Sequence, residues 1–445
     1  LISSTQTMKL STSILSSLFF AALACADGEF NVLSFNVAGL PEILQSNGES
    51  LDKTTATTQI GKKFSELRDQ LDVIHVQEDF NYHATLYKYD DHPYRTATSG
   101  GVPFGSGLNT LSNYNWVDFS RTKWNKCSDA SEYDCWTPKG FTHMRMELES
   151  GVYISMINLH ADAGTEDGDE TARDSNIQQV ADYIDSWATD EAVIVFGDTN
   201  SRYTRTDDNI SVFSSQNGLT DAWVKLIRNG VAPSKGADAI MCSNPSTTNN
   251  CEVVDKVFYR SSKFVTLDAT AFNYVGSDFE YDNDTLSDHN PILVNFTYTV
   301  SDDFRTSELT GGNYGEVFFN DINSLTDGSH PTKLSFRGAK RLDNVGLTLS
   351  SGTVLSHGGS GGDLSELTLA DGEYWTKATL CTGTKSGTLR NFYISATTSK
   401  GNALSAGSKT SDCTSYEAPS GYQIGGFYGQ SGDNVDQLGF IYIKT

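Results

Sequence analysis

The chain has 445 residues, about three times the commonest domain size, so at least two packed cores are expected. Its apolar fraction of 38% suffices for packed domains and excludes a linker-like polymer. A formal net charge of −24 argues against a basic nucleic-acid groove spread over the surface. It leaves phosphodiester substrates open, because a bound divalent metal is the largest local charge in such a site.

Residues 1–26 have the features of a secretion signal with a few residues upstream of it. A basic start at Met8-Lys9 and an apolar run over 14–23 precede small residues at 24–26, which suit a cleavage site. The run is shorter than the roughly 20 residues of a bilayer span, and no later segment is long enough. The sequence therefore predicts a secreted, extracellular chain beginning near Asp27, without a transmembrane segment.

The six cysteines after this signal lie in close pairs along the chain, which favours three disulfides. A metal site is disfavoured because no Cys-x-x-Cys spacing occurs. The expected pairs are Cys127 with Cys135, Cys242 with Cys251, and Cys381 with Cys413. Sequons at Asn209, Asn283 and Asn295 predict a glycoprotein wherever these residues are exposed.

Short apolar strands alternate with polar loops from Phe30 onward. The predicted strands cover 30–36, 73–77, 152–159, 192–196, 253–259 and 292–296. Apolar spacing predicts amphipathic helices over 59–71 and 169–187. Strands mixed with a few helices indicate an α/β or α+β sandwich with the helices outside.

Polar residues stand at the ends of several apolar strands, where side chains converge on a site in α/β architectures. A single such residue is usually a cap or a turn residue. Here five clusters occur in one order, and their joint occurrence indicates a site. They are Asn36 in LSFNVAGLP, Glu78 in VIHVQED, His160 in INLHADAG, Asp198 with Asn200 in VFGDTN, and Asp288-His289 in LSDHNP.

This order of motifs resembles the endonuclease/exonuclease/phosphatase superfamily, which includes pancreatic deoxyribonuclease, abasic-site endonucleases, inositol-polyphosphate phosphatases and neutral sphingomyelinases. GDTN and SDHNP are the most specific pieces, and the similarity covers residues 30–299. The resemblance implies a catalytic domain over 27–300, folded as a four-layer α/β sandwich of two β-sheets flanked by helices.

The resemblance also implies a metal site formed by Asn36 and Glu78, with Asp288 close to the ion. Hard oxygen ligands suit Mg²⁺, with Mn²⁺ as the alternative. Mg²⁺ keeps several waters and a substrate oxygen, so few protein ligands are expected.

The remaining motif residues acquire catalytic roles by the same resemblance. His289 is expected to be the general base, oriented by Asp255 in VVDKVFY. Asp198 is expected to position or deprotonate the attacking water. Asn200 and His160 are expected to donate hydrogen bonds to the phosphoryl oxygens in the transition state.

Several other residues between the motifs allow two interpretations, as site residues or as ordinary surface or core residues. Lys139 and Arg145 could contact the substrate phosphate, or be solvated or salt-bridged surface charges. Tyr114, Trp116 and Trp136 could contact lipid or a base, or belong to the core.

The chain contains neither an H-E-x-x-H nor a G-x-S-x-G motif, which argues against zinc and serine hydrolases. Secretion, acidity and the lack of basic runs favour a small or lipid phosphodiester, similar to sphingomyelin, with peripheral contact to a membrane. The alternative is an extracellular nuclease. An inositol-polyphosphate phosphatase fits less well, because its anionic headgroup requires a Lys/Arg cluster.

The apolar pattern breaks over 301–312, which predicts a linker, and the composition of 313–445 is typical of an all-β domain. Gly311-Gly312, the segment 357–375 and YGQSGDNVDQLGFIYI at 428–443 resemble a jacalin-like lectin domain, a β-prism. Cys381 and Cys413 depart from typical lectins and are expected to link a strand pair.

In that family a sugar is held by backbone amides of the last loop, an aspartate and an N-terminal glycine. The matching residues here are Gly312 and the run Gly432, Asp433, Asn434, Val435 and Asp436. A mannose- or glucose-type ligand is expected over galactose, because galactose-selective relatives use a free N-terminal glycine. The rival class of function is a carbohydrate-binding lectin with an inactive phosphoesterase fold.

Overall fold

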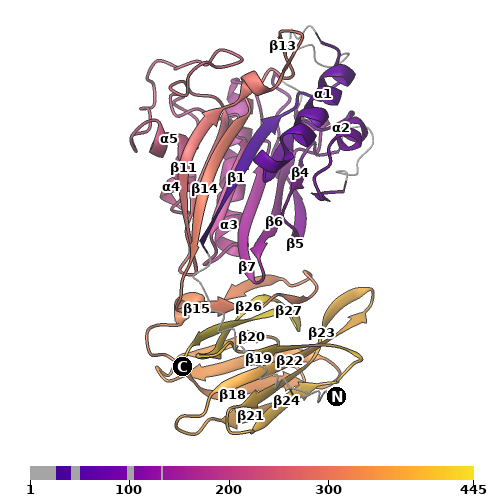
Figure 1. Ribbon diagram of the computed structural model, residues 1–445, viewed down its shortest axis with the longest axis vertical. Helices are drawn as coiled ribbons and strands as arrows, with labels where there is room; N and C mark the ends of the chain where they lie inside the picture. The colour runs from indigo at the N-terminus through magenta and orange to yellow at the C-terminus, as the bar shows by residue number, and fades with distance from the viewer. Residues whose placement is uncertain (1–26, 42–50, 98–104, 132–133) are drawn as a thin grey trace, which may run out of the picture.

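The computed structural model describes residues 27–41, 51–97, 105–131 and 134–445, so the predicted signal at 1–26 lies outside the described residues. Two units are stacked along the long axis of the molecule (Figure 1). The upper unit contains helices and strands, and the lower unit is built almost entirely of strands. Within the described ranges, no helix combines the length and apolar character needed to cross a bilayer.

Two six-stranded sheets form the upper unit. The first has the order β11-β14-β1-β2-β4-β3, with β1 (Asp27–Asn36), β2 (Val73–Gln77), β3 (Tyr94–Arg95), β4 (Asn109–Ser112), β11 (Val265–Tyr274) and β14 (Ile292–Val300). The second has the order β5-β6-β7-β8-β10-β9, with β5 (Trp116–Lys123), β6 (Gly140–Glu149), β7 (Val152–Leu159), β8 (Val193–Asp198), β9 (Thr220–Asp221) and β10 (Asp255–Arg260). A separate hairpin pairs β12 (Glu280–Tyr281) with β13 (Asp284–Thr285).

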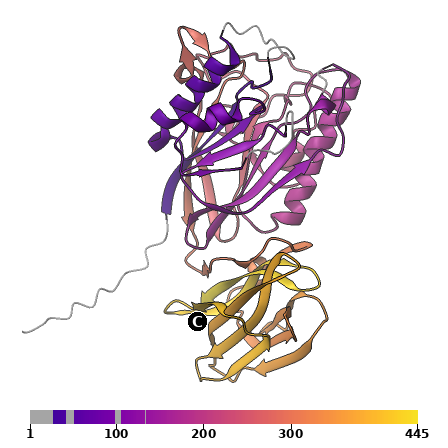
Figure 2. The same cartoon turned by 90° about the vertical axis from the view of Figure 1, so that its right-hand side faces the viewer.

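Strand β1 is buried on both faces because each face packs against a different layer. Val32 belongs to the core between the two sheets, whereas its neighbour Leu33 belongs to the core under helix α1 (Lys53–Glu66). Figure 2 shows α1 and α2 (His83–Tyr89) over one outer side of the unit and α3 (Asp167–Trp187) over the other. Long apolar strands are therefore shielded from water on both sides.

Both predicted long helices are present, and both begin before the predicted residue. The one expected over 59–71 starts at Lys53, because Asp52 caps it by accepting from Thr55 N at 2.9 Å. Its first turns lack the apolar spacing on which the prediction depended. The other described helices are short: α4 (Val212–Ser215), α5 (Ala222–Leu226), and the 3-10 helices η1 (Arg68–Gln70), η2 (Asp134–Trp136), η3 (Gly276–Asp278) and η4 (Ile322–Ser324).

Strand directions bring the motif residues to one end of the upper unit. β1 and β2 are parallel, so Asn36 and Gln77 are paired where both strands end. In the second sheet β7 and β8 are parallel, and His160 pairs with Asp198 just beyond β7. The antiparallel neighbour β10 begins at Asp255, opposite Asp198. Residues distant in sequence therefore meet at this end.

Three sheets form the lower unit. The first contains β15 (Phe304–Thr306), β16 (Thr310–Gly311), β17 (Val317–Asn320), β26 (Tyr422–Ser431) and β27 (Val435–Lys444). The second contains β18 (Pro331–Gly338), β19 (Leu342–Leu349), β20 (Val354–Gly358) and β21 (Asp363–Thr368). The third contains β22 (Trp375–Lys385), β23 (Thr388–Thr398), β24 (Ala403–Gly407) and β25 (Asp412–Glu417).

Two short strands within 301–312, the predicted linker, belong to the lower unit's sheet. β15 pairs with β27 from Phe304 opposite Ile443, and β16 pairs with the same strand from Thr310 opposite Leu438. Strands of two or three residues have too few positions to show an alternating pattern, so this pairing could not be predicted from the sequence.

A buried arginine in the upper unit contacts the lower unit. Arg145 donates to Asp118 at 2.7 Å and to Glu191 at 2.8 Å, and its guanidinium lies 3.8 Å from the ring centroid of Phe318 in the lower unit. Arg145 is 1% exposed. It is therefore neither a phosphate contact nor a surface charge, the two readings that the sequence left open.

Asp118 joins the same network from a β-bulge. The register between β5 and β6 shifts after Val117, and Asp118 adopts a φ of 59°, which is uncommon for a residue other than glycine. The bulge directs its carboxylate to the lower unit, where it accepts from Gln430 at 3.1 Å and from Gln437 at 2.7 Å. The two units are thus docked through buried, hydrogen-bonded charges.

All three predicted disulfides are confirmed. Cys127–Cys135 and Cys242–Cys251 close loops at the site end of the upper unit, and Cys381–Cys413 links β22 to β25 in register.

A buried histidine between the two sheets makes stability depend on pH. The ring of His75 stacks on Phe196 with centroids 3.5 Å apart, and burial lowers the pKa of His75 from 6.5 to about 3. Because the folded pKa lies below the unfolded one, the unfolded chain gains the proton first as pH falls below 6.5. We expect this residue to reduce the free energy of unfolding by about 1.4 kcal/mol per pH unit in that range.

Urea denaturation of the wild type and of His75→Gln between pH 6.5 and about 5 checks this prediction. The glutamine does not titrate, so the variant should lose less stability per pH unit. Equal slopes for the two proteins would contradict it.

Candidate active site

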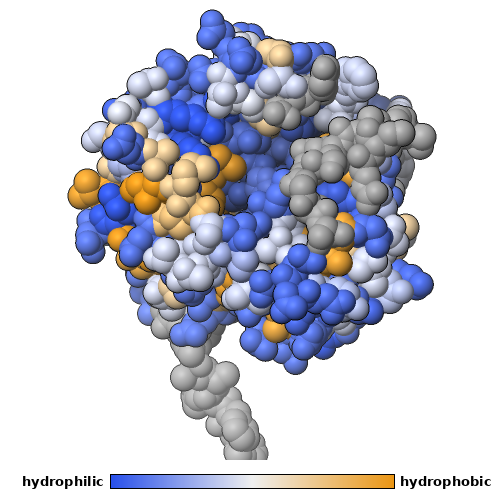
Figure 3. Space-filling model, turned by 90° about the horizontal axis from the view of Figure 1, so that it is seen from above, coloured by the Kyte–Doolittle hydropathy of each residue, from blue (hydrophilic) through white to orange (hydrophobic). Residues whose placement is uncertain are grey.

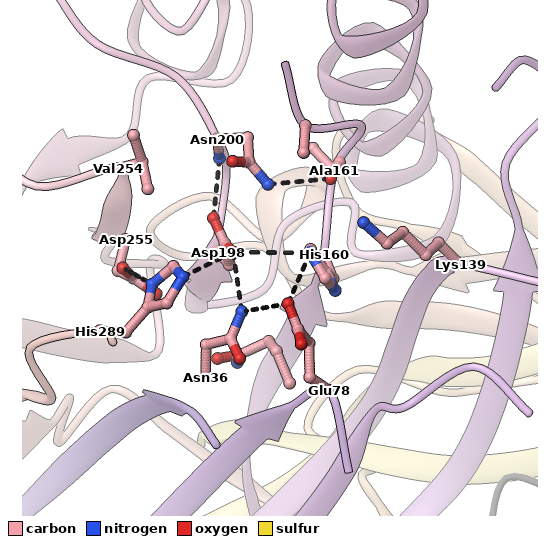
Figure 4. A network of polar contacts seen from close by, with 12 residues as sticks. Asn36, Glu78, Lys139, His160, Ala161, Asp198, Asn200, Val254, Asp255 and His289 are labelled. Carbon is pink, nitrogen blue, oxygen red and sulfur yellow. Dashed lines mark hydrogen bonds and ion pairs between the residues drawn. The ribbon is translucent and has the colours of Figure 1, made fainter. Parts of the chain in front are cut away.

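Asn36 and Glu78 contact each other where β1 and β2 end (Figure 4). Asn36 Nδ2 donates to Glu78 Oε1 at 3.0 Å and to Asp198 Oδ2 at 3.1 Å, so this amide links the two sheets. Glu78 adopts a left-handed φ of 57°. Such a conformation is rare outside glycine and is typically retained at functional sites.

The oxygen atoms around Glu78 fit a hard divalent cation. Glu78 Oε2 is buried and has no hydrogen-bond partner among the described residues, so it is an acceptor available to a cation. The amide oxygen of Asn36 accepts from Ala38 N at 3.0 Å and keeps a second lone pair. Asp288 is exposed, and its charge acts on Glu78. Burial raises the pKa of Glu78, and the negative charge of Asp288 also raises it. Such an oxygen set suits Mg²⁺ or Mn²⁺.

Asp255 lies within hydrogen-bond distance of His289. His289 Nδ1 lies 2.8 Å from Asp255 Oδ2, and Nε2 lies 3.9 Å from Asp198 Oδ2. Burial would lower the pKa of His289, but the two carboxylates outweigh it and raise the pKa well above its usual range. With Nδ1 engaged, Nε2 is the nitrogen that can exchange a proton in the space beside Asp198.

One atom from each of Asp198, Asp255 and His289 lies within 4.8 Å of the other two, a spacing that could also hold a cation. Asp255 already occupies one nitrogen of this histidine, so the group is better suited to proton transfer. The all-oxygen set at Glu78 is the better match to Mg²⁺.

His160 lies on the other side of Asp198. Its Nε2 is 3.5 Å from Asp198 Oδ2 and 4.0 Å from Glu78 Oε1. Burial lowers the pKa of His160 well below its usual range, and the charge of Lys139 lowers it further. The imidazole is therefore neutral at physiological pH, with one N–H to donate.

Asp198 is held by Asn200, which follows it by two residues. Asn200 N donates to Asp198 Oδ1 at 2.9 Å, and Asn200 Nδ2 donates to Ala161 O at 3.1 Å. Burial and, after it, the charge of Asp255 raise the pKa of Asp198 to about 6. Asp198 can therefore change protonation state near neutral pH.

Lys139 belongs to this site, which the sequence left undecided. It is 7% exposed, its ammonium pairs with Asp134, and Figure 4 shows its side chain beside His160. Burial would lower the pKa of Lys139, but Asp134 and Glu78 outweigh it and raise the pKa. A solvated surface charge is thus excluded.

The three aromatic candidates differ in exposure. Tyr114 and Trp116 are partly buried against the core, whereas Trp136 is 65% exposed.

Two residues that the sequence analysis did not predict also support the site. Ser287 Oγ donates to Asn36 O at 2.6 Å and accepts from His289 N at 3.2 Å, so it joins the histidine loop to β1. A Cβ at Gly39 would overlap the carbonyl oxygen of Glu78. Ser287 could have been predicted from its position inside the SDHNP motif, whereas no feature of the sequence around Gly39 indicates its role.

Figure 3 views the molecule onto the end where these strands finish. It shows a hydrophilic hollow, bordered on its left by a group of apolar side chains. A substrate with a charged group and an apolar part would find both kinds of surface there.

The predicted sugar-binding residues of the lower unit lie together. Gly312 N donates to Asp436 O at 3.1 Å, which places the N-terminal glycine beside the last loop. Asp436, however, pairs with Arg390 at 2.7 Å, and its side chain is only 2% exposed. In the same loop Asn434 accepts from Arg341 at 2.5 Å. The sequence analysis did not predict either arginine, because both lie far from this loop in the sequence.

Comparisons with known proteins identify both units. Residues 12–250 match the family model described as Endonuclease/Exonuclease/phosphatase family 2, and residues 307–441 match the Jacalin-like lectin domain. A sphingomyelinase from Mycobacterium bovis is 37% identical over 281 residues, which are 61% of this chain and 54% of that protein. The chain thus spans about half the length of the curated relatives it matches.

Solved structures resemble each unit. Sphingomyelinase C from Streptomyces griseocarneus is 17% identical with a TM-score of 0.40, and covers 60% of this chain and 99% of its own. A mannose binding jacalin related lectin from Ananas comosus is 23% identical with a TM-score of 0.27, and covers 32% of this chain and 99% of its own.

Proposed function

The chain belongs to endonuclease/exonuclease/phosphatase family 2, and from that premise we propose that residues 27–300 form a four-layer α/β sandwich that hydrolyses a phosphodiester by metal-assisted attack of water. The observation that carries this proposal is the convergence of Asn36, Glu78, His160, Asp198 and His289 within one polar network.

Asn36 and Glu78 would hold a Mg²⁺ ion, with Asp288 close to it and Mn²⁺ as the alternative metal. When bound, the ion neutralises charge that builds on the phosphoryl oxygens. Glu78 is suited to this role by its buried, unpartnered Oε2. Asn36 keeps that carboxylate in place through its 3.0 Å hydrogen bond.

His289 is the group proposed to accept the proton of the attacking water. Asp255 holds its Nδ1 and stabilises the imidazolium that forms, so Nε2 is aimed at the space beside Asp198. Asp198 would orient the water through Oδ2. For this role Nε2 must be unprotonated when substrate is bound, although the two carboxylates favour the charged ring.

His160, Asn200 and Lys139 would stabilise the transition state. His160 is neutral and can donate to a phosphoryl oxygen, and Asn200 lies beside it on the loop after β8. The ammonium of Lys139 lies on the same side of the site and would add a positive charge. All three act on charge that develops during in-line displacement.

We favour a lipid phosphodiester of the sphingomyelin type as substrate, with peripheral contact to a membrane. Supporting this choice are the sphingomyelinase relatives and the hydrophilic hollow with apolar side chains beside it (Figure 3). An extracellular nuclease is the second candidate, since the site requires only local phosphate contacts.

One panel assay tests this proposal. Sphingomyelin vesicles, plasmid DNA, RNA and inositol phosphates would be incubated with the full chain, with Mg²⁺ and with EDTA. We expect turnover of sphingomyelin that EDTA abolishes and that excess Mg²⁺ or Mn²⁺ restores. Cleavage of DNA or RNA without turnover of sphingomyelin would establish the nuclease instead. No turnover of any substrate would favour the inactive-fold lectin.

For residues 313–445 we propose a β-prism that binds a mannose- or glucose-type glycan through Gly312 and the loop from Gly432 to Asp436. Binding would raise the local concentration of the enzyme at a glycosylated surface.

We expect Asp436→Ala to weaken binding of the full chain to mannose-coated beads by about tenfold, because the carboxylate accepts sugar hydroxyls. Asp363→Asn, which also removes an exposed lectin-domain charge, should bind normally. Equal binding by wild type and Asp436→Ala would refute this role.

We further propose that the mature chain is extracellular and glycosylated. Three disulfides agree with an oxidising compartment. Asn283 and Asn295 are exposed, whereas Asn209 is half-buried and donates its side-chain N–H to Asp174 O at 2.9 Å. The first two sequons are therefore the better acceptors.

A further inference from the structure

A cavity of about 570 Å³ opens at the end of the lectin domain that carries the C-terminus, which is marked in Figure 1. Its walls are the loops 325–332 and 369–374 and the residues 443–445. Strand β27 runs from the loop 432–436 to this cavity. The two places are about 30 Å apart, because an extended strand rises about 3.3 Å per residue. The cavity is thus separate from the proposed sugar loop.

The floor of the cavity is apolar except for one amide. Phe304, Leu325, Leu369 and Ile443 line it, and each is less than a tenth exposed. Gln423 lies among them and is 2% exposed. Its Oε1 is buried and has no hydrogen-bond partner among the described residues. A buried acceptor without a donor is costly, so a ligand that brings an O–H or N–H would satisfy it.

The rim of the cavity carries mostly negative charge. The carboxylate of Glu373 accepts hydrogen bonds from Thr398 and from Ala370 N. These bonds lower the pKa of Glu373 to about 2, so this carboxylate is ionised. Lys444 pairs with Asp303 at 2.9 Å, which cancels one charge. The remaining titratable groups that line the cavity are Asp327, Asp371, His330 and Tyr374. Asp327 and Asp371 are exposed and form no ion pair among the described residues, whereas the charge of Lys400 acts on Glu373.

We propose that this cavity binds an amino sugar, a glycan unit with a protonated amine. The ring of a sugar has an apolar face that can pack on Phe304 and Leu369, and its hydroxyls can donate to Gln423 Oε1. The ammonium pairs with the carboxylates of the rim. The volume lies within the usual range for small-ligand sites. This inference depends neither on the phosphodiesterase activity nor on binding at the loop 432–436.

Calorimetric titration of the full chain with a β-linked glucosamine oligomer tests the proposal, and the fully N-acetylated oligomer is the matched ligand. At mildly acidic pH we expect saturable binding of the amine form, and binding at least about tenfold weaker for the acetylated form, which carries no charge. Raising the salt concentration should weaken the first interaction. No saturable binding, or equal binding of both oligomers, would overturn the proposal.

Variants locate the ligand. Replacing Asp327 and Asp371 together by asparagine should weaken binding about fivefold, and Gln423→Leu should weaken it without lowering the melting temperature, because no internal hydrogen bond of Oε1 is lost. Asp363→Asn removes one exposed carboxylate outside the lining and should bind as wild type. Asp436→Ala should also bind normally. Loss of binding in Asp436→Ala would place the amino sugar at the loop 432–436 and contradict the inference.

Discussion

Glu78→Ala is expected to lower kcat/KM for the phosphodiester by about a thousandfold or more while the protein remains folded. The change removes one of the two carboxylates that accept from Asn36 and leaves the proposed metal without its principal ligand. Folding should be nearly unaffected, because Glu78 Oε2 makes no hydrogen bond within the described chain. Steady-state kinetics and urea denaturation of the same preparation would measure both effects.

Glu66→Ala is the matched control, because Glu66 is an exposed glutamate on α1 in a surface ion pair with Lys63. It should retain wild-type activity. His160→Ala and His289→Ala should abolish turnover as Glu78→Ala does, since each removes a group that acts on the reacting phosphate or water. Full activity in any one of these three variants would refute its assignment.

The second large effect concerns the contact between the units. Arg145→Met is expected to lower the free energy of unfolding by about 3–5 kcal/mol, because Asp118 and Glu191 would remain as buried charges without their partner. The loss should appear in both units, since Phe318 loses its stacking partner. Denaturation followed by intrinsic fluorescence would measure it.

Arg68→Met provides the comparison, because Arg68 pairs with Asp91 at 3.4 Å at an exposed position and should cost less than about 1 kcal/mol. Combining Arg145→Met with Asp118→Asn should recover part of the stability by removing one unpaired charge. If Arg145→Met unfolds at the same urea concentration as the wild type, the buried network does not hold the units together.

Much of the architecture could be predicted from local pattern. The strand from Phe30 to Asn36 is apolar on both faces, and its length and flanking polar residues distinguished it from a helix. The parallel pairs β1–β2 and β7–β8 explain why polar residues at separate strand ends meet in one place. The meeting of the candidate residues at one end of the unit thus followed from the strand pattern together with the family resemblance.

The remaining features arise from pairs that are distant in the sequence. Arg145 contacts Phe318, and Arg390 pairs with Asp436, yet neither pair leaves any periodic trace in the chain. The strands within 301–312 are too short to read, because their pairing depends on the backbone of β27. Side-chain charge alone also could not distinguish the buried Lys139 from a surface lysine.

The most direct test of the central claim is the fate of oxygen during hydrolysis of sphingomyelin in heavy-oxygen water with Mg²⁺ present. Attack of an activated water on phosphorus predicts one heavy oxygen atom in the phosphocholine product and none in the ceramide, with no labelled product after Glu78→Ala. Heavy oxygen in the ceramide, or equal turnover by wild type and Glu78→Ala, would contradict the account.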